Sequence, residues 1–285
     1  MTKNQLQSKD VRIGILLSIF GAILLSTKGI FAKLLYESGA DYESVTMVRG
    51  VLSLPLFWIW FIIKKKSTFR NIPAKNFWCA AFAGYLCYYL GAMINFYALT
   101  LIDANLERLI LYSFPAIVVM LSSILKRKLP TLVVCISLVT IYIGLFLSIG
   151  GLNKDLFLSN IFGVSLVLLS AIAVSIYFLF NEKYGKSIGS ISFTTIAMTA
   201  ATIGLVLHTM VSNNYFWMNW SHDMWIIMFL LVIISTTIPL FMIAEGINKA
   251  GASISSIGTT VGPPSTIIIA WLVLGETMSI YQIAG

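Results

Sequence analysis

The sequence predicts an all-α fold, a polytopic bundle of membrane helices made of two inverted five-helix repeats. The first observation is composition: the 285 residues are 58% hydrophobic and 11% charged, with a mean hydropathy of +0.91, unlike a soluble domain. The second is that the apolar residues form runs long enough to cross a hydrocarbon core of ~30 Å as helices. The third is that two such runs, 104–128 and 252–276, each carry proline near the middle.

A membrane-spanning helix needs ~20 apolar residues. The first run has no convincing signal-peptide cleavage site, so we expect a retained helix. We expect spans at residues 13–35, 45–63, 77–101, 104–125, 131–149, 161–180, 191–211, 224–247 and 252–274. A tenth span begins near Ser279 and is cut off at Gly285, so we expect it to be truncated in this sequence.

Lysine and arginine predict the orientation, because cytoplasmic loops hold the excess of these residues. The sequence has nineteen lysines and arginines. With the N-terminus inside, Lys33, Arg108 and Lys154 lie on the outer side, and Lys28 and Arg49 lie within spans. We therefore expect a multi-pass protein of a bacterial cytoplasmic (inner) membrane with a cytoplasmic N-terminus. The other fourteen lie on the inner side: Lys3, Lys9, Arg12, Lys64, Lys65, Lys66, Arg70, Lys75, Lys126, Arg127, Lys128, Lys183, Lys186 and Lys249.

The two halves of the sequence, 1–150 and 151–285, read as copies of one unit. At an offset of 149 residues, identities recur at Gly14, Leu17, Ala22, Ile23, Ser26 and Phe31, matched by Gly163, Leu166, Ala171, Ile172, Ser175 and Phe180. At an offset of 148 residues, Ala104 and Pro115 match Ala252 and Pro263. Because each unit has an odd number of spans, the second copy enters the membrane from the opposite side. Such inverted repeats are typical of secondary transporters.

The prolines predict interrupted helices. An interior proline costs a helix ~3 kcal/mol, which a membrane bundle tolerates when neighbouring helices or a water-lined space satisfy the backbone. We expect helix breaks at Pro115, Pro263 and Pro264. Paired interrupted spans in the two halves of a membrane protein indicate a transport pathway.

Several stretches resemble the EamA-type family of the drug/metabolite transporter superfamily. They are Arg49 in the second span, residues 98–115 (ALTLIDANLERLILYSFP), and AGAS at 250–253 leading through Pro263 to LGE at 274–276. The resemblance covers almost the whole chain and implies two five-span halves in a carrier of amino acids, other metabolites or drugs. The sequence departs from the family pattern at residues 126–128, Lys-Arg-Lys, where the first half usually reads Gly-Glu.

Charged residues near or within the spans are the first candidates for substrate binding or coupling. Lys28 lies ~22 Å into a core of ~30 Å, too deep to reach the cytoplasm easily, so it either carries a charge for substrate binding or coupling or reaches the outer interface. Glu107 and Arg108 open the fourth span, where one is expected to line the pathway and the other to pair with Arg49 or Asp103; a structural ion pair is the alternative. Glu245 is a second acid, either coupled to transport or simply a partner of Lys249 four residues on.

Polar residues in the spans complete the candidate set: Tyr88, Asn95, Tyr112 and Thr236. The alternative is that they only hydrogen-bond neighbouring helices, as polar residues commonly do in membranes. We find no catalytic or metal-ligand spacing, and we expect the three cysteines to be packing residues. An intramembrane enzyme would need a catalytic or metal-binding set of residues, which is not found. A membrane scaffold would not need prolines at equivalent positions of the two halves.

Together these features predict a secondary active transporter that moves a small organic metabolite by alternating access. No nucleotide-binding loop is recognised, so we expect coupling to protons or another gradient and no cofactor. Acids and bases together favour an amino acid or similar zwitterion, and a multidrug or lipophilic-cation exporter is the alternative. The expected partners are the substrate, the lipid bilayer and protons, in a monomer or homodimer. Nucleic acid is not expected, because the basic residues form short clusters between spans.

Overall fold

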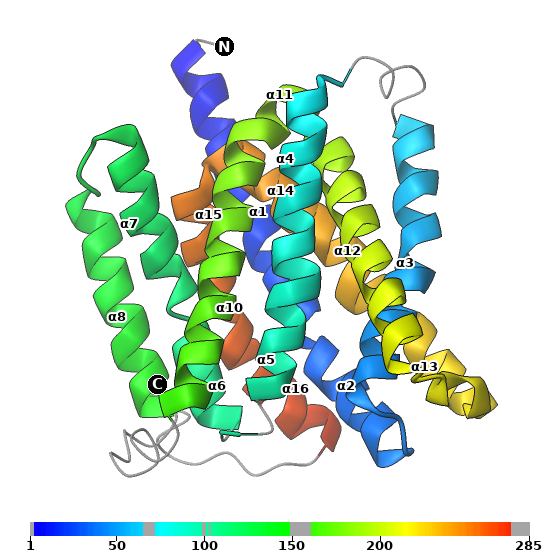
Figure 1. Ribbon diagram of the computed structural model, residues 1–285. Helices are drawn as coiled ribbons and strands as arrows, with labels where there is room; N and C mark the ends of the chain where they lie inside the picture. Colours follow the sequence, from blue (N-terminus) through cyan, green and yellow to red (C-terminus); the bar gives the residue numbers. More distant parts are fainter. Residues whose placement is uncertain (1–2, 65–71, 99–100, 103, 149–160, 275–285) are drawn as a thin grey trace.

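The chain folds into a bundle of helices (Figure 1). The computed structural model describes residues 3–64, 72–98, 101–102, 104–148 and 161–274, and all regular structure in these ranges is helical. The first half has α1 (Lys3–Ser26), α2 (Lys28–Glu37), α3 (Tyr42–Lys64), α4 (Ala74–Gly84), the π-helix η2 (Tyr85–Gly91), α5 (Ala92–Ala98), α6 (Ala104–Leu111), α7 (Phe114–Lys126) and α8 (Leu132–Ser148).

The second half has α10 (Ile161–Phe180), the π-helix η3 (Asn181–Gly185), α11 (Lys186–Ile188), α12 (Ser190–Ser212), the 3₁₀ helix η4 (Phe216–Asn219), α13 (His222–Val232), the π-helix η5 (Ile233–Thr237), α14 (Ile238–Ala250), α15 (Ala252–Gly258), the 3₁₀ helix η6 (Thr259–Val261) and α16 (Gly262–Leu274).

The helices confirm the predicted polytopic membrane bundle. Among the described residues, six continuous helical stretches are long and apolar enough to cross a membrane: Lys9–Glu37, Tyr42–Ile63, Ala74–Ala98, Ile161–Ile188, Ser190–Ser212 and His222–Ala250. The other expected spans are α8 and the interrupted pairs α6 with α7 and α15 with α16. The expected tenth span lies outside the described residues.

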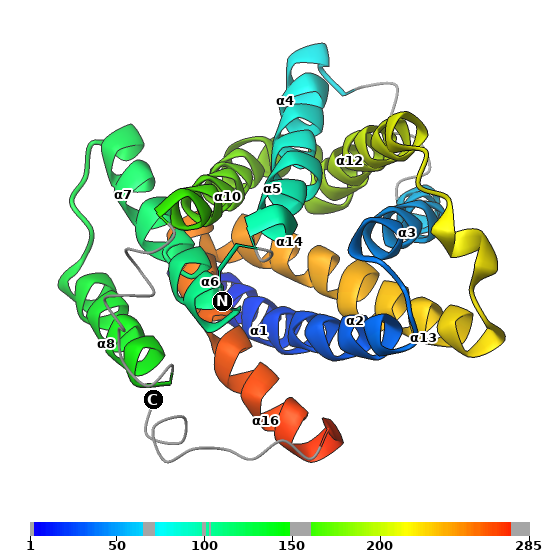
Figure 2. The ribbon, with the colours of Figure 1, turned by 60° about the horizontal axis from the view of Figure 1, so that its bottom comes forward.

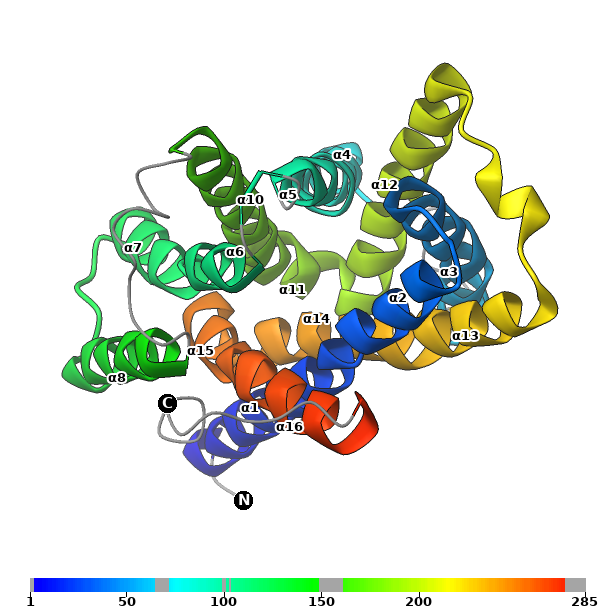
Figure 3. The same ribbon diagram turned by 90° about the horizontal axis from the view of Figure 1, so that it is seen from below.

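Corresponding helices of the two halves run in opposite directions. In Figure 1, α1 descends from the end of the bundle where the N-terminus lies, whereas its counterpart α10 rises toward that same end. α1 packs along α14, and α12 packs against both α3 and α4. Seen from the other end of the bundle, α8 lies at one edge and α13 at the opposite side (Figures 2 and 3). The interior is therefore built jointly by both halves.

The charged residues gather at opposite ends of the bundle. The N-terminus, the start of α4, the turn between α7 and α8, and α11 all lie at one end in Figure 1. These segments, together with η3 before α11 and the end of α14, carry the basic residues Lys75, Lys126, Arg127, Lys128, Lys183, Lys186 and Lys249. The opposite end carries acidic residues near the tips of α2, α3 and α13: Glu37, Asp41, Glu43 and Asp223. We call the first the basic end.

The first span is one helical stretch, as expected, with a single turn residue, Thr27, inside it. The chain turns at Thr27, between α1 and α2. The hydroxyl of Ser26 donates to the Ala22 carbonyl at 2.7 Å, and that of Thr27 donates to the Leu24 carbonyl at 2.7 Å. Serine and threonine hydroxyls that bond back to their own helix commonly bend it. Lys28 therefore begins a new helix inside the span.

Candidate functional site

Three helix interruptions come together inside the bundle. One is the turn at Thr27, the second lies between α6 and α7, and the third is η6 between α15 and α16. Pro115 lies in the first turn of α7, and Pro263 with Pro264 in the first turn of α16, where a missing N–H costs a helix little. α15 packs against α7, and α1 packs against η6 and α16. The interruptions therefore bring short helix ends from both halves to one region.

Two hydrogen bonds join these interruptions across the repeats. The Ser26 hydroxyl donates to the Gly262 carbonyl at 2.9 Å, and the Ser175 hydroxyl donates to the Phe114 carbonyl at 3.1 Å. Gly262 and Phe114 each precede a helix-starting proline. Ser26 and Ser175 are equivalent at the repeat offset of 149 residues, as Phe114 and Gly262 are at 148. Each half thus supplies a serine that binds the interrupted helix of the other half.

The π-helical segments η2 and η5 also occupy equivalent positions in the two repeats. At the offset of 148 residues, Tyr85 at the start of η2 matches Ile233 at the start of η5, and Tyr88 matches Thr236. π-Helical turns occur often at functional sites. The neighbour of Thr236, Ser235, is joined to the turn at Thr27 by a hydroxyl–hydroxyl contact of 2.5 Å. Thr236 itself donates to a carbonyl of its own helix, so its hydroxyl is already used.

Two cations of the interior converge on η2. Arg49 of α3, which is partly buried, interacts electrostatically with Tyr36 of α2 and Tyr88 of η2. Lys28, at the first position of α2, interacts with Cys87, which precedes Tyr88. Two of the candidates taken from the sequence, Lys28 and Arg49, therefore act on the same turn of η2.

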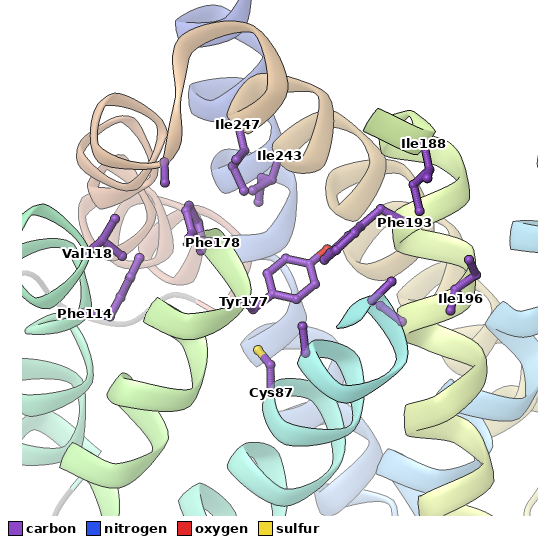
Figure 4. Packing of buried hydrophobic residues seen from close by; sticks show 14 of the residues in the cluster. Cys87, Phe114, Val118, Tyr177, Phe178, Ile188, Phe193, Ile196, Ile243 and Ile247 are labelled. Atoms are coloured by element: carbon purple, nitrogen blue, oxygen red, sulfur yellow. The ribbon is translucent and has the colours of Figure 1, made fainter. Parts of the chain in front are cut away.

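Tyr177 of α10 is an interior residue that the sequence analysis missed. It is 2% exposed, and its ring packs edge-on against that of Tyr88 with centroids 4.8 Å apart. Figure 4 shows it reaching between Cys87 and Phe193. Its hydroxyl interacts with Tyr88 and with the buried Thr194, but forms no hydrogen bond of good geometry within the described residues. A tyrosine in an apolar helix gives no sequence signal that separates it from packing residues.

The acid Glu107 lies next to Asn95. The Asn95 side-chain amide donates to Glu107 Oε1 at 2.7 Å, and Glu107 is 6% exposed. This bond connects α5 to α6, so it joins two of the candidate residues. The expected pairing of Glu107 or Arg108 with Arg49 or Asp103 stays a prediction; the electrostatic neighbours of Arg49 among the described residues are Tyr36 and Tyr88. The Arg108 side chain and Asp103 lie outside the described residues.

The acid Glu245 lies at the basic end rather than in the interior. It accepts a hydrogen bond of 2.5 Å from Ser190 and lies 3.6 Å from Lys249, which also contacts Asp10 at 3.1 Å. A second ion pair at this end joins Lys126 to Glu182 at 2.7 Å. These contacts connect α1, α12 and α14, and α7 with η3. Glu245 therefore has the partner that the structural alternative predicted.

Tyr112 lies where the interruptions of the fourth and ninth spans meet. Its carbonyl accepts a hydrogen bond of 3.0 Å from Tyr142, and its hydroxyl faces Gly262 so closely that a Cβ there would lie 2.5 Å from it. Tyr112 therefore lies at the helix breaks, whereas Tyr88 lies beside the cation Arg49.

The matches to known proteins follow the same division into halves. The model of the EamA-like transporter family matches residues 12–150 and again residues 161–285. The chain belongs to the EamA-like transporter family. Residues 151–160 lie between the two matched segments, after α8 and before α10 in the sequence.

Relatives of this EamA-like protein are also described as transporters. The uncharacterized transporter YcbK of Bacillus subtilis (strain 168) is 28% identical over 287 residues, covering 99% of this chain and 92% of the relative. The uncharacterized transporter YdfC of the same organism is 31% identical over 123 residues, covering 43% of this chain and 40% of the relative. These relatives and the family support membrane transport, rather than an enzymatic reaction, as its function.

A solved crystal structure of a protein has the same fold. It matches with a TM-score of 0.79 and 13% identity, covering 95% of this chain and 91% of the solved chain. At this identity the match shows the fold alone. It adds to the evidence that the EamA-like chain is a polytopic helical bundle.

Proposed function

We propose that this EamA-like protein is a secondary active transporter that carries a small organic metabolite by alternating access. The observation that carries the proposal is the reciprocal pair of serine bonds, from Ser26 to Gly262 and from Ser175 to Phe114. They join interrupted helices of two oppositely directed halves. Inverted repeats give alternating access a natural two-state geometry, with the substrate between them.

The proposed substrate region is the interior between the helix breaks and η2. It contains Lys28, Arg49, Tyr88 and Tyr112, which supply two cations and two hydroxyl groups. The amino acids remain the preferred class to test first, because they carry a carboxylate for the cations. Proton or other gradient coupling is part of the proposal.

The proposed orientation puts the basic end in the cytoplasm of a bacterium, with the protein in its inner membrane. The basis is the excess of lysine and arginine at one end of the bundle, where Asp10, Glu182 and Glu245 form ion pairs with lysines. In this orientation the ion pairs of Glu245 and Glu182 lie on the cytoplasmic side.

The test is uptake of a radiolabelled amino-acid panel into proteoliposomes of the full-length protein, with and without an imposed pH gradient. We expect gradient-dependent flux of one or a few amino acids, and loss of that flux in Lys28→Ala. Lys75→Ala, an exposed lysine at the basic end, is the matched control and should transport normally.

Two results would contradict parts of the proposal. Full flux in Lys28→Ala with unchanged kinetics would show that Lys28 only extends toward the membrane interface. If no amino acid moved and lipophilic dye cations moved instead, the protein would be a cation exporter. Flux of neither class would contradict the carrier function itself.

A further inference from the structure

Arg49 places a fixed positive charge within a membrane span. An intramembrane arginine is costly and normally has a charged or polar partner that serves a function. Among the described residues, its electrostatic neighbours are Tyr36 and Tyr88, whose phenols are neutral at physiological pH. These hydroxyls can solvate the guanidinium, but they do not neutralise its charge.

Three of the described carboxylates, Asp41, Glu107 and Glu245, have hydrogen-bond partners of their own. Asp41, which also interacts with Tyr36, accepts bonds from Asn214 at 3.0 Å and from the Ser44 backbone at 2.9 Å. Glu107 is bonded to Asn95, and Glu245 to Ser190. None of these acids is an electrostatic neighbour of Arg49 in the described part of the chain.

Beside Arg49 lies a row of buried hydroxyl groups. The Tyr88 ring packs on that of Tyr177, whose hydroxyl faces Thr194. The hydroxyls of Tyr177 and Thr194 are both buried and without a well-formed hydrogen bond among the described residues. Buried hydroxyls usually find a partner, so these donors are suited to a polar ligand. Lys28 adds positive potential at the neighbouring Cys87.

We propose that Arg49 and the Tyr88 hydroxyl bind the carboxylate of the transported substrate. The inference rests on the proposed carrier function and names its substrate class: small organic acids, with amino acids recognised through the carboxylate rather than the amine. An arginine guanidinium presents two parallel N–H donors that match a carboxylate, which a lysine ammonium does not. The main anchor for the anion is then Arg49, with Lys28 in a supporting position.

The first test needs no variant. Leucine, serine and phenylalanine are each compared with the corresponding amide and the corresponding 2-hydroxy acid. Each compound is tested as a competitor of uptake, and as a ligand that raises the melting temperature of the detergent-solubilised full-length protein. We expect each free acid to be at least about tenfold more potent than the amide, since a charge-assisted hydrogen bond is lost. The 2-hydroxy acid, which lacks the amine, should be nearly as potent as the amino acid.

The second test assigns the anchor. We expect Arg49→Gln to raise KM by about tenfold or more, and Arg49→Lys to recover only part of that loss because it keeps the charge without the planar fork. Tyr88→Phe, which removes one hydroxyl, should raise KM less. Arg12→Gln removes an exposed guanidinium of α1 and should leave KM unchanged.

The outcomes separate this inference from the carrier function. Amides as potent as acids, or a wild-type KM in Arg49→Gln, would overturn the carboxylate site while leaving a working transporter. A second outcome is that carboxylates raise the melting temperature, and do so less in Arg49→Gln, while no proteoliposome shows flux. This result would support the carboxylate site and contradict the carrier function. Neither binding nor flux of any acid would overturn both.

Discussion

At the scale of single residues, close packing between α4 and α12 depends on Gly84. A Cβ added at this position would overlap the backbone of Ala197, which cannot move aside as a flexible side chain can. In a membrane, small residues at such contacts let helix backbones approach closely. We therefore expect Gly84→Ala to destabilise the bundle by about 1–3 kcal/mol, the usual cost of overpacking.

The measurement is unfolding of the purified protein in mixed micelles. Gly50→Ala is the matched control, because its added Cβ would meet only side-chain atoms of Leu205 and Thr202, the nearest 3.1 Å away. A smaller loss for Gly50→Ala than for Gly84→Ala is expected. Equal losses would mean that backbone contact at Gly84 is not what limits the packing.

The individual candidate residues show how far a sequence can predict a site. Lys28 and Arg49 could be selected because a charge in an apolar run is anomalous. Their surroundings could not, since the position of η2 depends on how both halves pack. Tyr177 gave no signal at all, and Glu245 was ambiguous until its contact with Ser190 showed that it lies at the basic end.

At the scale of helices, the reciprocal serine bonds predict symmetric effects. Ser26→Ala and Ser175→Ala each remove one bond between repeats, so we expect each to lower the free energy of unfolding by ~0.6 kcal/mol, the mean for such bonds in membranes. Both should also slow transport to a similar degree. Ser165→Ala is the control, because its exposed hydroxyl bonds only the Phe162 carbonyl of its own helix.

Unfolding titrations and transport rates of the three variants test this prediction. Similar effects of Ser26→Ala and Ser175→Ala, with none for Ser165→Ala, would support a two-fold related pair. If only one of the two serines mattered, the bonds would be independent helix contacts, and the argument for a symmetric pivot would fail.

The helices themselves were largely predictable, for physical reasons. Apolar length fixed the spans, and proline chemistry indicated where α7 and α16 begin. The turn at Thr27 and the π-helices η2 and η5 were not foreseen, although Gly84 and Gly91 flank most of η2 and Pro239 follows η5. Their geometry depends on hydroxyl bonds and on packing against other helices, such as the contact of Thr27 with Ser235.

At the scale of the whole molecule, the inverted arrangement of the two repeats was predicted from an odd number of spans per copy. Inversion is visible as the opposite directions of α1 and α10 (Figure 1). What the sequence could not provide is which residues of the two halves meet in the middle. Arg49 lies beside Tyr36 and Tyr88, whereas Glu107 of α6 is bonded to Asn95.

The separation of charge between the two ends predicts the topology in the cell. In a variant with Cys79, Cys87 and Cys135 replaced by alanine, single cysteines are introduced at Lys128 and at Asp223. These positions lie at the basic and the acidic end, respectively. A membrane-impermeant maleimide should label Asp223→Cys in intact cells, and Lys128→Cys only in inverted vesicles.

The physical basis is that positively charged loops are retained in the cytoplasm during insertion, whereas acidic residues contribute little. Both halves contribute basic residues to the same end, for example Lys126 from the first half and Lys186 from the second. Reversed labelling would show that the lysines of this end do not set the orientation. It would also move the ion pairs of Glu182 and Glu245 to the outer side.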